Sequence, residues 1–140
     1  MPSPIQTPSA YSVSRAVAFA DVDGTALLVS STVPLPVTMG QAVTSPLAGS
    51  TAATGIVGPF IPVLGRPVIL SLQGSWTGTV KVVRSTDGGA TKLSLTVGGS
   101  LWAQFPGNCC EAVWDESDAA ARLYLDIALM SGSVSYRLAQ

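Results

Sequence analysis

The densest group of side chains that could do chemistry is a run of carboxylates late in the chain, formed by Glu111, Asp115, Glu116 and Asp118. Carboxylates at this density can bind Ca²⁺ where backbone oxygens complete the shell, although the spacing of an EF-hand loop is missing. Nothing in the sequence places two of them on opposite sides of a cleft, as a glycosidase requires. We predict a solvated acidic loop and leave two alternatives open: calcium binding, and contact with a basic patch on a neighbouring protein.

A second chemical pattern occupies residues 85–91, which read Ser-Thr-Asp-Gly-Gly-Ala-Thr. It matches the start of the Asp-box found on hairpins of sialidase-type propellers, but Lys92 stands where that motif has a tryptophan. The pattern occurs once, whereas a propeller repeats a blade of about 40 to 50 residues several times. We therefore predict a hairpin turn in which Asp87 accepts hydrogen bonds from nearby backbone and the glycines adopt positive φ.

The other reactive residue types do not form a catalytic set. The sequence has no histidine, so no serine can be assigned a base that would make it a nucleophile. Cys109 and Cys110 are adjacent, which is unfavourable for a disulfide, and no C-x-x-C pattern indicates a zinc or redox site. We predict two buried thiols in a reducing cell. We also expect no enzymatic activity and no cofactor, and we assign no residue to catalysis or metal binding.

Three tryptophans, Trp76, Trp102 and Trp114, stand at predicted strand ends or beside turns. A large ring at such a position can close the end of a sandwich core or anchor a protein interface. Stacking on a carbohydrate is the alternative, but no surrounding set of Asn, Gln, Asp and Arg is evident. We therefore predict core closure.

Composition indicates a chain whose surface is partly covered by a partner. Hydrophobic residues make up 47% and charged residues 11%, against a typical charged share of about 25%. A net charge of −1 with scattered basic residues argues against nucleic-acid binding, which depends on clustered Lys and Arg. The most apolar region, residues 52–72, contains Arg66 and three prolines and does not fit a membrane-spanning helix. The N-terminus lacks the pattern of a signal peptide, so we expect no export.

The N-terminal part of the chain is predicted to be an arm followed by a hairpin. Residues 1–14 are rich in Pro, Ser and Thr and lack periodicity, which is typical of an extended arm. Two β-prone runs, 15–20 and 25–30, flank Asp21 and an Asp23-Gly24 pair, and Asp-Gly between such runs is a strong hairpin signal. We interpret Asp21 and Asp23 as turn formers.

A proline-rich connector at residues 33–37 is predicted to separate this arm from the main domain, because alternate prolines fix φ and remove backbone donors. We assign residues 1–37 to an N-terminal arm, hairpin and connector, and residues 38–140 to a single β-sandwich domain. Within that domain the small residues near its start favour a loop at 46–55, with a weak strand signal at 41–44.

The main domain alternates apolar and polar residues with the two-residue period of strands. Strands are predicted at residues 60–64, 67–73, 79–84, 91–97, 101–105, 112–114, 122–130 and 133–138. Turns at Asp87-Gly88-Gly89, Gly98-Gly99 and Ser131-Gly132 join consecutive strands as hairpins. One short helical turn is predicted at 117–121, capped by Ser117 or Asp118. The pattern therefore predicts an all-β fold, an antiparallel β-sandwich with jelly-roll or Greek-key wiring.

Several short turn and strand motifs, each occurring once, are distributed along the chain past residue 15. They are Gly-Pro-Phe at 58–60, Gln-Gly-Ser-Trp-Thr-Gly-Thr-Val at 73–80, Arg-Ser-Thr-Asp-Gly-Gly at 84–89, Glu-Ala-Val-Trp at 111–114, Ser-Gly-Ser-Val-Ser-Tyr-Arg-Leu at 131–138 and, upstream, the Asp23-Gly24 hairpin that leads to Pro-Leu-Pro-Val at 34–37. Together they resemble small β-rich structural proteins of tailed bacteriophages. Such proteins are virion components, and a chain of this size fits a capsid decoration, or cement, protein.

The resemblance implies a protein made in the host cytoplasm and carried in many copies on the capsid surface, often as homotrimers. It implies that an arm or loops grip the major capsid protein or other virion proteins, and it carries over no catalytic residue. The candidate interface residues are then Tyr11, Val13, Phe19, Leu35, Val37, Trp76 and Trp102. A neck or tail component, such as a fibre base or receptor-binding module, is an alternative. A carbohydrate-binding or calcium-binding module is another.

Overall fold

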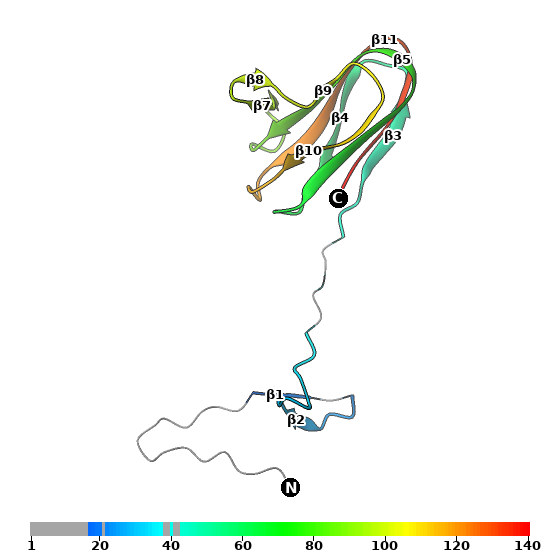
Figure 1. The fold of residues 1–140 in the computed structure, drawn as a ribbon. Helices are drawn as coiled ribbons and strands as arrows, with labels where there is room; N and C mark the ends of the chain where they lie inside the picture. Colours follow the sequence, from blue (N-terminus) through cyan, green and yellow to red (C-terminus); the bar gives the residue numbers. More distant parts are fainter. Residues whose placement is uncertain (1–16, 21, 38–39, 41–42) are drawn as a thin grey trace. The chain divides into compact units, whose positions relative to one another are not determined.

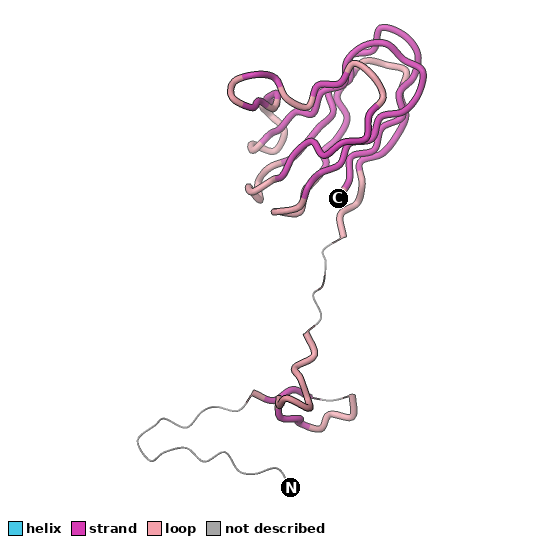
Figure 2. Tube along the Cα trace, in the orientation of Figure 1, coloured by secondary structure: helices cyan, strands magenta, loops and turns pink. Residues whose placement is uncertain are grey.

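The computed structural model describes residues 17–20, 22–37, 40 and 43–140, and every regular element within them is a β-strand (Figures 1 and 2). The chain divides into two compact units, residues 1–41 and 42–140, which we describe separately. Among the described residues no helix has the length and apolar character needed to cross a membrane.

The N-terminal unit contains one small hairpin. Its strands, β1 (Ala18–Ala20) and β2 (Ala26–Leu28), pair antiparallel along their whole length. Gly24 takes φ +83° in the turn, and the Asp23 carboxylate accepts a hydrogen bond from the Thr25 N–H at 3.0 Å. The predicted Asp-Gly hairpin and the turn-forming role of Asp23 are confirmed, with strands shorter than the β-prone runs. Asp21 lies outside the described residues.

Two long strands, β5 (Pro67–Ser85) and β11 (Arg122–Ala139), organise the second unit. They pair antiparallel from end to end, and the ribbon that they form bends in its middle (Figure 1). On its outer side the first half of β5 pairs with β10 (Cys109–Asp115), whereas its second half pairs with β6 (Leu93–Ser94) and β9 (Gln104–Phe105). Each half of the ribbon therefore belongs to a different layer.

The strand β11 is shared between layers in the same way. Its first half pairs with β4 (Gly55–Phe60) and its second half with β3 (Leu47–Thr51). One layer thus runs β10, β5, β11, β3, and the other runs β6 with β9, β5, β11, β4. Numbered along the chain, with β5 and β11 each counted as two segments, this is the strand order of a jelly roll, in which two four-stranded antiparallel layers pack face to face. The predicted fold class is confirmed.

Glycines at the bend explain how the two long strands can fold over without a break. An added Cβ would lie 2.1 Å from the Ala128 carbonyl oxygen at Gly78 and 2.0 Å from the Ser75 carbonyl oxygen at Gly132, so only glycine permits this backbone approach. Met130 is an extra, unpaired residue between Leu129 and Ser131, which is a β-bulge and adds to the bend. The prediction of separate strands on either side of these glycines, joined at Ser131-Gly132 by a hairpin turn, was wrong.

The core lies between the inner faces of the two layers. In both halves of β5 the side chains that face the core belong to even-numbered residues. In β11 they belong to odd-numbered residues before the bulge and to even-numbered residues after it, so the bulge keeps the same face of β11 turned to the core. The buried cluster consists of Phe60, Val68, Leu70, Leu72, Val80, Val82, Leu95, Ala103, Val113, Leu123, Leu125, Ile127, Val134 and Leu138. Burial of these apolar side chains is the main force that holds the layers together.

One edge strand carries an inserted hairpin, which we call the flap (residues 95–102). Leu93 and Ser94 pair with Arg84 and Val83, and the pairing resumes at Gln104 beside Lys81. Between them, β7 (Thr96–Val97) and β8 (Ser100–Leu101) pair with each other around Gly98-Gly99, and the Trp102 N–H donates to the Leu95 carbonyl at 2.8 Å to close the base. The predicted turn at Gly98-Gly99 is confirmed, as is the turn at Asp87-Gly88-Gly89 between β5 and β6.

Two local predictions were wrong, and a third was correct only in part. The expected loop at 46–55 contains β3, because its small residues make room for the next strand: a Cβ on Gly49 would lie 2.6 Å from Oη of Tyr136. The strand expected at 60–64 instead ends at Phe60. At 117–121 the predicted short turn is present with Asp118 as its cap, accepting from the N–H of Ala120, but the turn is not helical. Of the weak signal at 41–44, residues 43 and 44 carry no strand and the others lie outside the described residues.

Candidate functional site

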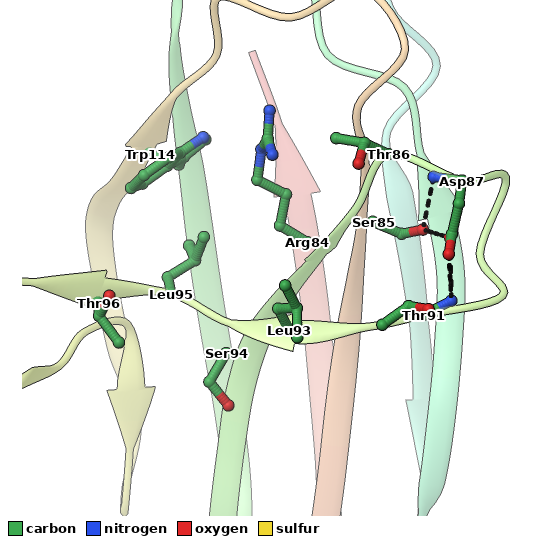
Figure 3. Close-up of a pocket in the computed structure, with 10 residues that line it drawn as sticks. All are labelled: Arg84, Ser85, Thr86, Asp87, Thr91, Leu93, Ser94, Leu95, Thr96 and Trp114. Carbon is green, nitrogen blue, oxygen red and sulfur yellow. Dashed lines mark hydrogen bonds between the residues drawn. The ribbon is translucent and has the colours of Figure 1, made fainter. Parts of the chain in front are cut away.

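A shallow pocket of about 270 Å³ lies where the turn between β5 and β6 approaches β10 (Figure 3). It brings together both patterns that the sequence marks as chemical, since Asp87 of the Asp-box-like turn and Trp114 beside the acidic run share it. The complete lining is Arg84, Ser85, Thr86, Asp87, Thr91, Leu93, Ser94, Leu95, Thr96 and Trp114. Whether this pocket can bind a ligand or catalyse a reaction depends on which of its polar atoms already form hydrogen bonds within the protein.

The centre of the network behind the pocket is a bidentate ion pair between Arg84 and Glu116. The Arg84 Nε and Nη2 atoms donate to Oε2 and Oε1 of Glu116 at 2.7 and 2.9 Å. Glu116 is only 2% exposed, and the Trp114 indole N–H donates to Oε2 at 3.0 Å. Both Glu116 oxygens are therefore held by charged or dipolar donors in a dry environment, which is the strong form of a carboxylate hydrogen bond.

Backbone donors complete the environment of this carboxylate. The N–H groups of Ser117 and Asp118 donate to Glu116 Oε1 at 3.0 and 2.9 Å. The hydrogen bond from Arg84, assisted by the Asp118 amide and the Trp114 indole, lowers the pKa of Glu116 to about 2 in spite of its burial. The same hydrogen bond raises the pKa of Arg84. Glu116 is ionised and saturated, so it offers no lone pair for a metal or a proton transfer.

Asp87 is engaged in the turn in a similar way. Ser85 Oγ donates to its Oδ1 at 2.7 Å, and the Thr91 N–H lies 2.9 Å from both carboxylate oxygens (Figure 3). The Ser85 hydroxyl, and then the Thr91 amide, hold the pKa of Asp87 well below its usual range. Gly88 and Gly89 take φ +73° and +97°. The predicted hairpin role of this motif is confirmed.

An aromatic ring does pack beneath this turn, although it comes from another strand. A Cβ on Gly89 would lie 2.3 Å from Oη of Tyr124 in β11, so the turn sits directly on that phenol. Lys92 Nζ lies 4.8 Å from the centre of the Tyr124 ring and donates to the Gly89 carbonyl. The cation–π contact ties the turn to the sandwich where the Asp-box has its tryptophan.

The prediction of a solvated acidic loop was wrong for Glu116, which is buried, and for Glu111 and Asp115, which are exposed but belong to the strand β10. Asp118 is half-exposed and supports the ion pair, with 3.5 Å between its Oδ2 and Arg84 Nη2, while Glu111 and Asp115 are exposed. Within residues 17–20, 22–37, 40 and 43–140, no three His, Cys, Asp or Glu side chains lie close enough to hold a metal ion. Within the acidic run, Glu116 therefore stabilises the fold through its ion pair with Arg84.

A β-bulge in β10 positions Trp114 for this network. Ala112 pairs with Ile69 and Trp114 with Val68, which leaves Val113 as the extra residue, and Val113 is buried in the core. Sequence reasoning missed Arg84 as the partner of Glu116, because the two residues are 32 positions apart and no periodic signal links them. The usable signal was weak: a basic residue at the end of a predicted strand and a carboxylate beside a tryptophan.

The two cysteines both carry free thiols. As neighbours in β10 they point to opposite faces of the strand. Cys109 packs against the core, and burial raises the pKa of its thiol. Cys110 is exposed, so the prediction of two buried thiols was wrong for that residue.

The three tryptophans behave differently from one another. Trp76 and Trp114 pack against the core, as predicted. Trp102 is 47% exposed at the base of the flap, where its indole N–H donates to the Val113 carbonyl at 2.8 Å. Core closure was therefore the wrong prediction for Trp102. The Trp76 indole N–H donates to the Asn108 side chain at 2.8 Å.

The candidate interface residues that the structure describes belong to two different units of the chain. Phe19, Leu35 and Val37 belong to the N-terminal unit, where Leu35 is 44% and Val37 78% exposed and Phe19 is half-buried. Trp76 and Trp102 belong to the sandwich. Tyr11 and Val13 lie outside the described residues.

No protein-family model, no curated protein and no solved structure matches this chain.

Proposed function

We propose that this chain is a non-enzymatic structural component of a bacteriophage virion, a capsid decoration protein that bridges coat subunits and stabilises the closed shell. The observation that carries the proposal is the exposure of apolar side chains in the described part of the N-terminal unit, residues 17–20, 22–37 and 40. Val17, Leu28, Leu35 and Val37 are between 44% and 78% exposed there. An isolated two-stranded hairpin is at best marginally stable in water, so packing on a partner surface would stabilise the β1–β2 hairpin.

The sandwich fits this proposal, because it is a self-contained domain that the N-terminal unit could attach to the shell. Its core is self-contained, with every member of the buried cluster between Phe60 and Leu138. The two carboxylates at the candidate site are engaged in holding the fold, which favours a structural role over turnover. Jelly-roll order is used by viral capsid and lectin domains, although this is an argument by analogy of fold and not of site.

Shell stabilisation would then work by mass action. A protein that binds only the assembled shell stabilises it in proportion to its concentration relative to its dissociation constant. Apolar surface buried across subunit boundaries supplies the binding energy without a need for charge complementarity. The major capsid protein is the partner that this mechanism requires.

The test is reconstitution of purified shells with the full chain and with a Leu28→Asp/Val37→Asp variant. The wild type is expected to bind in many copies per particle and to raise the temperature at which shells release their contents. The variant should bind at least about tenfold more weakly, since a charge must be desolvated at the contact. Equal binding by both proteins would remove the arm from the mechanism, and failure of the wild type to bind any shell would overturn the proposal.

A second candidate is a receptor-binding module at the neck or tail of the particle, which one feature of the sandwich favours. Trp102 lines a pocket of about 180 Å³ together with Gln104, Phe105 and Glu111, a combination of ring, amide and carboxylate suited to sugar hydroxyls. Copy number separates the two positions, because decoration requires many copies spread over the shell and a neck or tail position only a small ring. Retention on a glycan column, lost in Trp102→Ala, would favour the second candidate.

A further inference from the structure

Three of the four edges of the jelly-roll layers carry no charge, whereas the fourth, β10, carries the exposed Glu111 and Asp115. The sequence has no Asp, Glu, Lys or Arg between Gly24 and Gly65, which covers β3 and β4, and none from Leu93 to Cys110, which covers β6, the flap and β9. These strands are the outermost members of their layers. Natural proteins usually protect such edges with charged side chains, and an edge without them pairs readily with another chain.

The flap side presents a convex apolar surface. Val97 and Leu101 of the flap are 58% and 62% exposed, Trp102 at its base is 47% exposed, and Leu93 just before it is 66% exposed. Figure 1 shows the β7–β8 hairpin standing out from the body of the sandwich. A protruding hairpin of this kind buries its side chains only when a second surface receives it.

The opposite side presents a groove. It encloses about 370 Å³ beside the end of β4 and is lined by Val43, Thr44, Ser45, Pro59, Ile61, Pro62 and Val63. Val43 is 96% and Ile61 56% exposed, and Ile56 of β4 is 54% exposed nearby in the sequence. The Thr44 hydroxyl oxygen is buried without a hydrogen-bond partner among the described residues, so a group entering the groove could satisfy it.

The layer orders place these two surfaces on opposite sides of the molecule, since β10, β6 and β9 end one side of the layers and β3 and β4 end the other. A contact between two different surfaces of identical chains is heterologous, and it produces a ring when the rotation closes. We propose that the flap of one copy packs into the groove beside β4 of a second copy, so that the chain forms a closed ring through two contact surfaces that carry no charged residue, the flap and the groove lining. The inference rests on the proposed function for the presence of many copies in one place.

A matched pair of charges tests this contact in the full-length chain. Val97→Asp changes the flap and Ile61→Lys changes the groove, and both positions are exposed enough for the fold to accept a charge. Size-exclusion chromatography with light scattering and native mass spectrometry are expected to show an oligomer for the wild type. Each single variant should raise the dissociation constant of that oligomer by about tenfold or more, because one charge is buried unpaired at the contact. Met130→Asp, at an 87% exposed bulge on neither side, is the control and should leave assembly unchanged.

Mixing the two single variants distinguishes a heterologous contact from a symmetric one. Each variant keeps one intact surface, so the mixture should form complexes that contain both chains, and the Val97→Asp/Ile61→Lys double variant should recover at least part of the wild-type assembly. Unchanged far-UV circular dichroism and thermal unfolding must accompany each loss of assembly. Dissociation by Val97→Asp alone, with Ile61→Lys unchanged, would show a flap-to-flap contact and overturn the inference, as would a monomeric wild type.

The same samples separate this inference from the proposed function. A wild type that binds shells as a monomer overturns the ring and leaves the decoration role in place. A wild-type ring that binds no shell overturns the decoration role and leaves the ring in place.

Discussion

Arg84 and Glu116 form a two-point ion pair across 32 residues of chain, with Nε to Oε2 at 2.7 Å and Nη2 to Oε1 at 2.9 Å. The pair joins the end of β5 to the segment that follows β10, and so it fastens one layer of the jelly roll to the other. Its two members differ in exposure, since the Arg84 side chain is 27% and the Glu116 side chain 2% exposed. Loss of the buried Glu116 carboxylate would therefore destabilise the fold more than loss of the partly exposed Arg84 side chain.

We expect Glu116→Gln to lower the free energy of unfolding by about 2 kcal/mol, because it removes a charged acceptor from Arg84, Trp114 and two amides while keeping the volume. Chemical denaturation monitored by tryptophan fluorescence measures the change. Asp118→Asn is the matched control: it touches the same arginine at 3.5 Å from a half-exposed position, so it should cost less than about 1 kcal/mol. Equal effects of the two substitutions would contradict the assignment of Glu116 as the central member.

Acid should destabilise the sandwich through the same carboxylate. The folded-state pKa of Glu116 is about 2 and its ordinary value is 4.5, so the unfolded chain takes up a proton first as the pH falls. The stabilisation is therefore complete above about pH 5 and disappears between about pH 5 and pH 2. Asp87, whose pKa is also lowered, acts in the same direction. Melting temperatures measured from pH 7 to pH 2 should fall less steeply in Glu116→Gln than in the wild type, and parallel curves would refute the linkage.

Local patterns predicted those elements whose causes are local. The Asp23-Gly24 hairpin, the Gly98-Gly99 turn and the Asp87 turn were all readable because each is decided by residues within a few positions. The all-β class and the jelly-roll wiring followed from two-residue periods and short connections. These features need no knowledge of a distant partner.

Features that depend on distant residues could not be predicted in the same way. Gly132 was interpreted as a turn residue, and Gly74 and Gly78 fell between two predicted strands, whereas all three mark the place where two backbones approach each other across a bend. The run at 46–55 looked like a loop because Tyr136, which covers Gly49, lies far along the chain. Arg84 and Glu116 offered no spacing rule at all. In each case the deciding contact is between strands, and no pattern within one strand contains it.

The bend itself should be intolerant of side chains. Gly132→Ala places a Cβ 2.0 Å from the Ser75 carbonyl oxygen at a φ of +80°, so we expect a loss of more than about 3 kcal/mol or failure to fold. Gly55→Ala is the control, because a Cβ there meets nothing within 4 Å and φ is not positive. Its effect should stay within about 0.5 kcal/mol. Urea unfolding of both variants tests the contrast, and a stable Gly132→Ala protein would show that the strands do not approach as described.

Thiol labelling should distinguish the adjacent cysteines of β10. Cys110 is exposed, whereas Cys109 packs against the core and burial raises the pKa of its thiol, so less of the reactive thiolate is present at neutral pH. With a maleimide or a disulfide reagent in native buffer, we expect one fast and one slow phase, the fast phase disappearing in Cys110→Ser and persisting in Cys109→Ser. Both phases should become fast and equal in denaturant. If Cys109→Ser removed the fast phase instead, β10 would have the opposite face turned to the core, and the register that pairs Cys109 with Leu72 would have to be shifted by one residue.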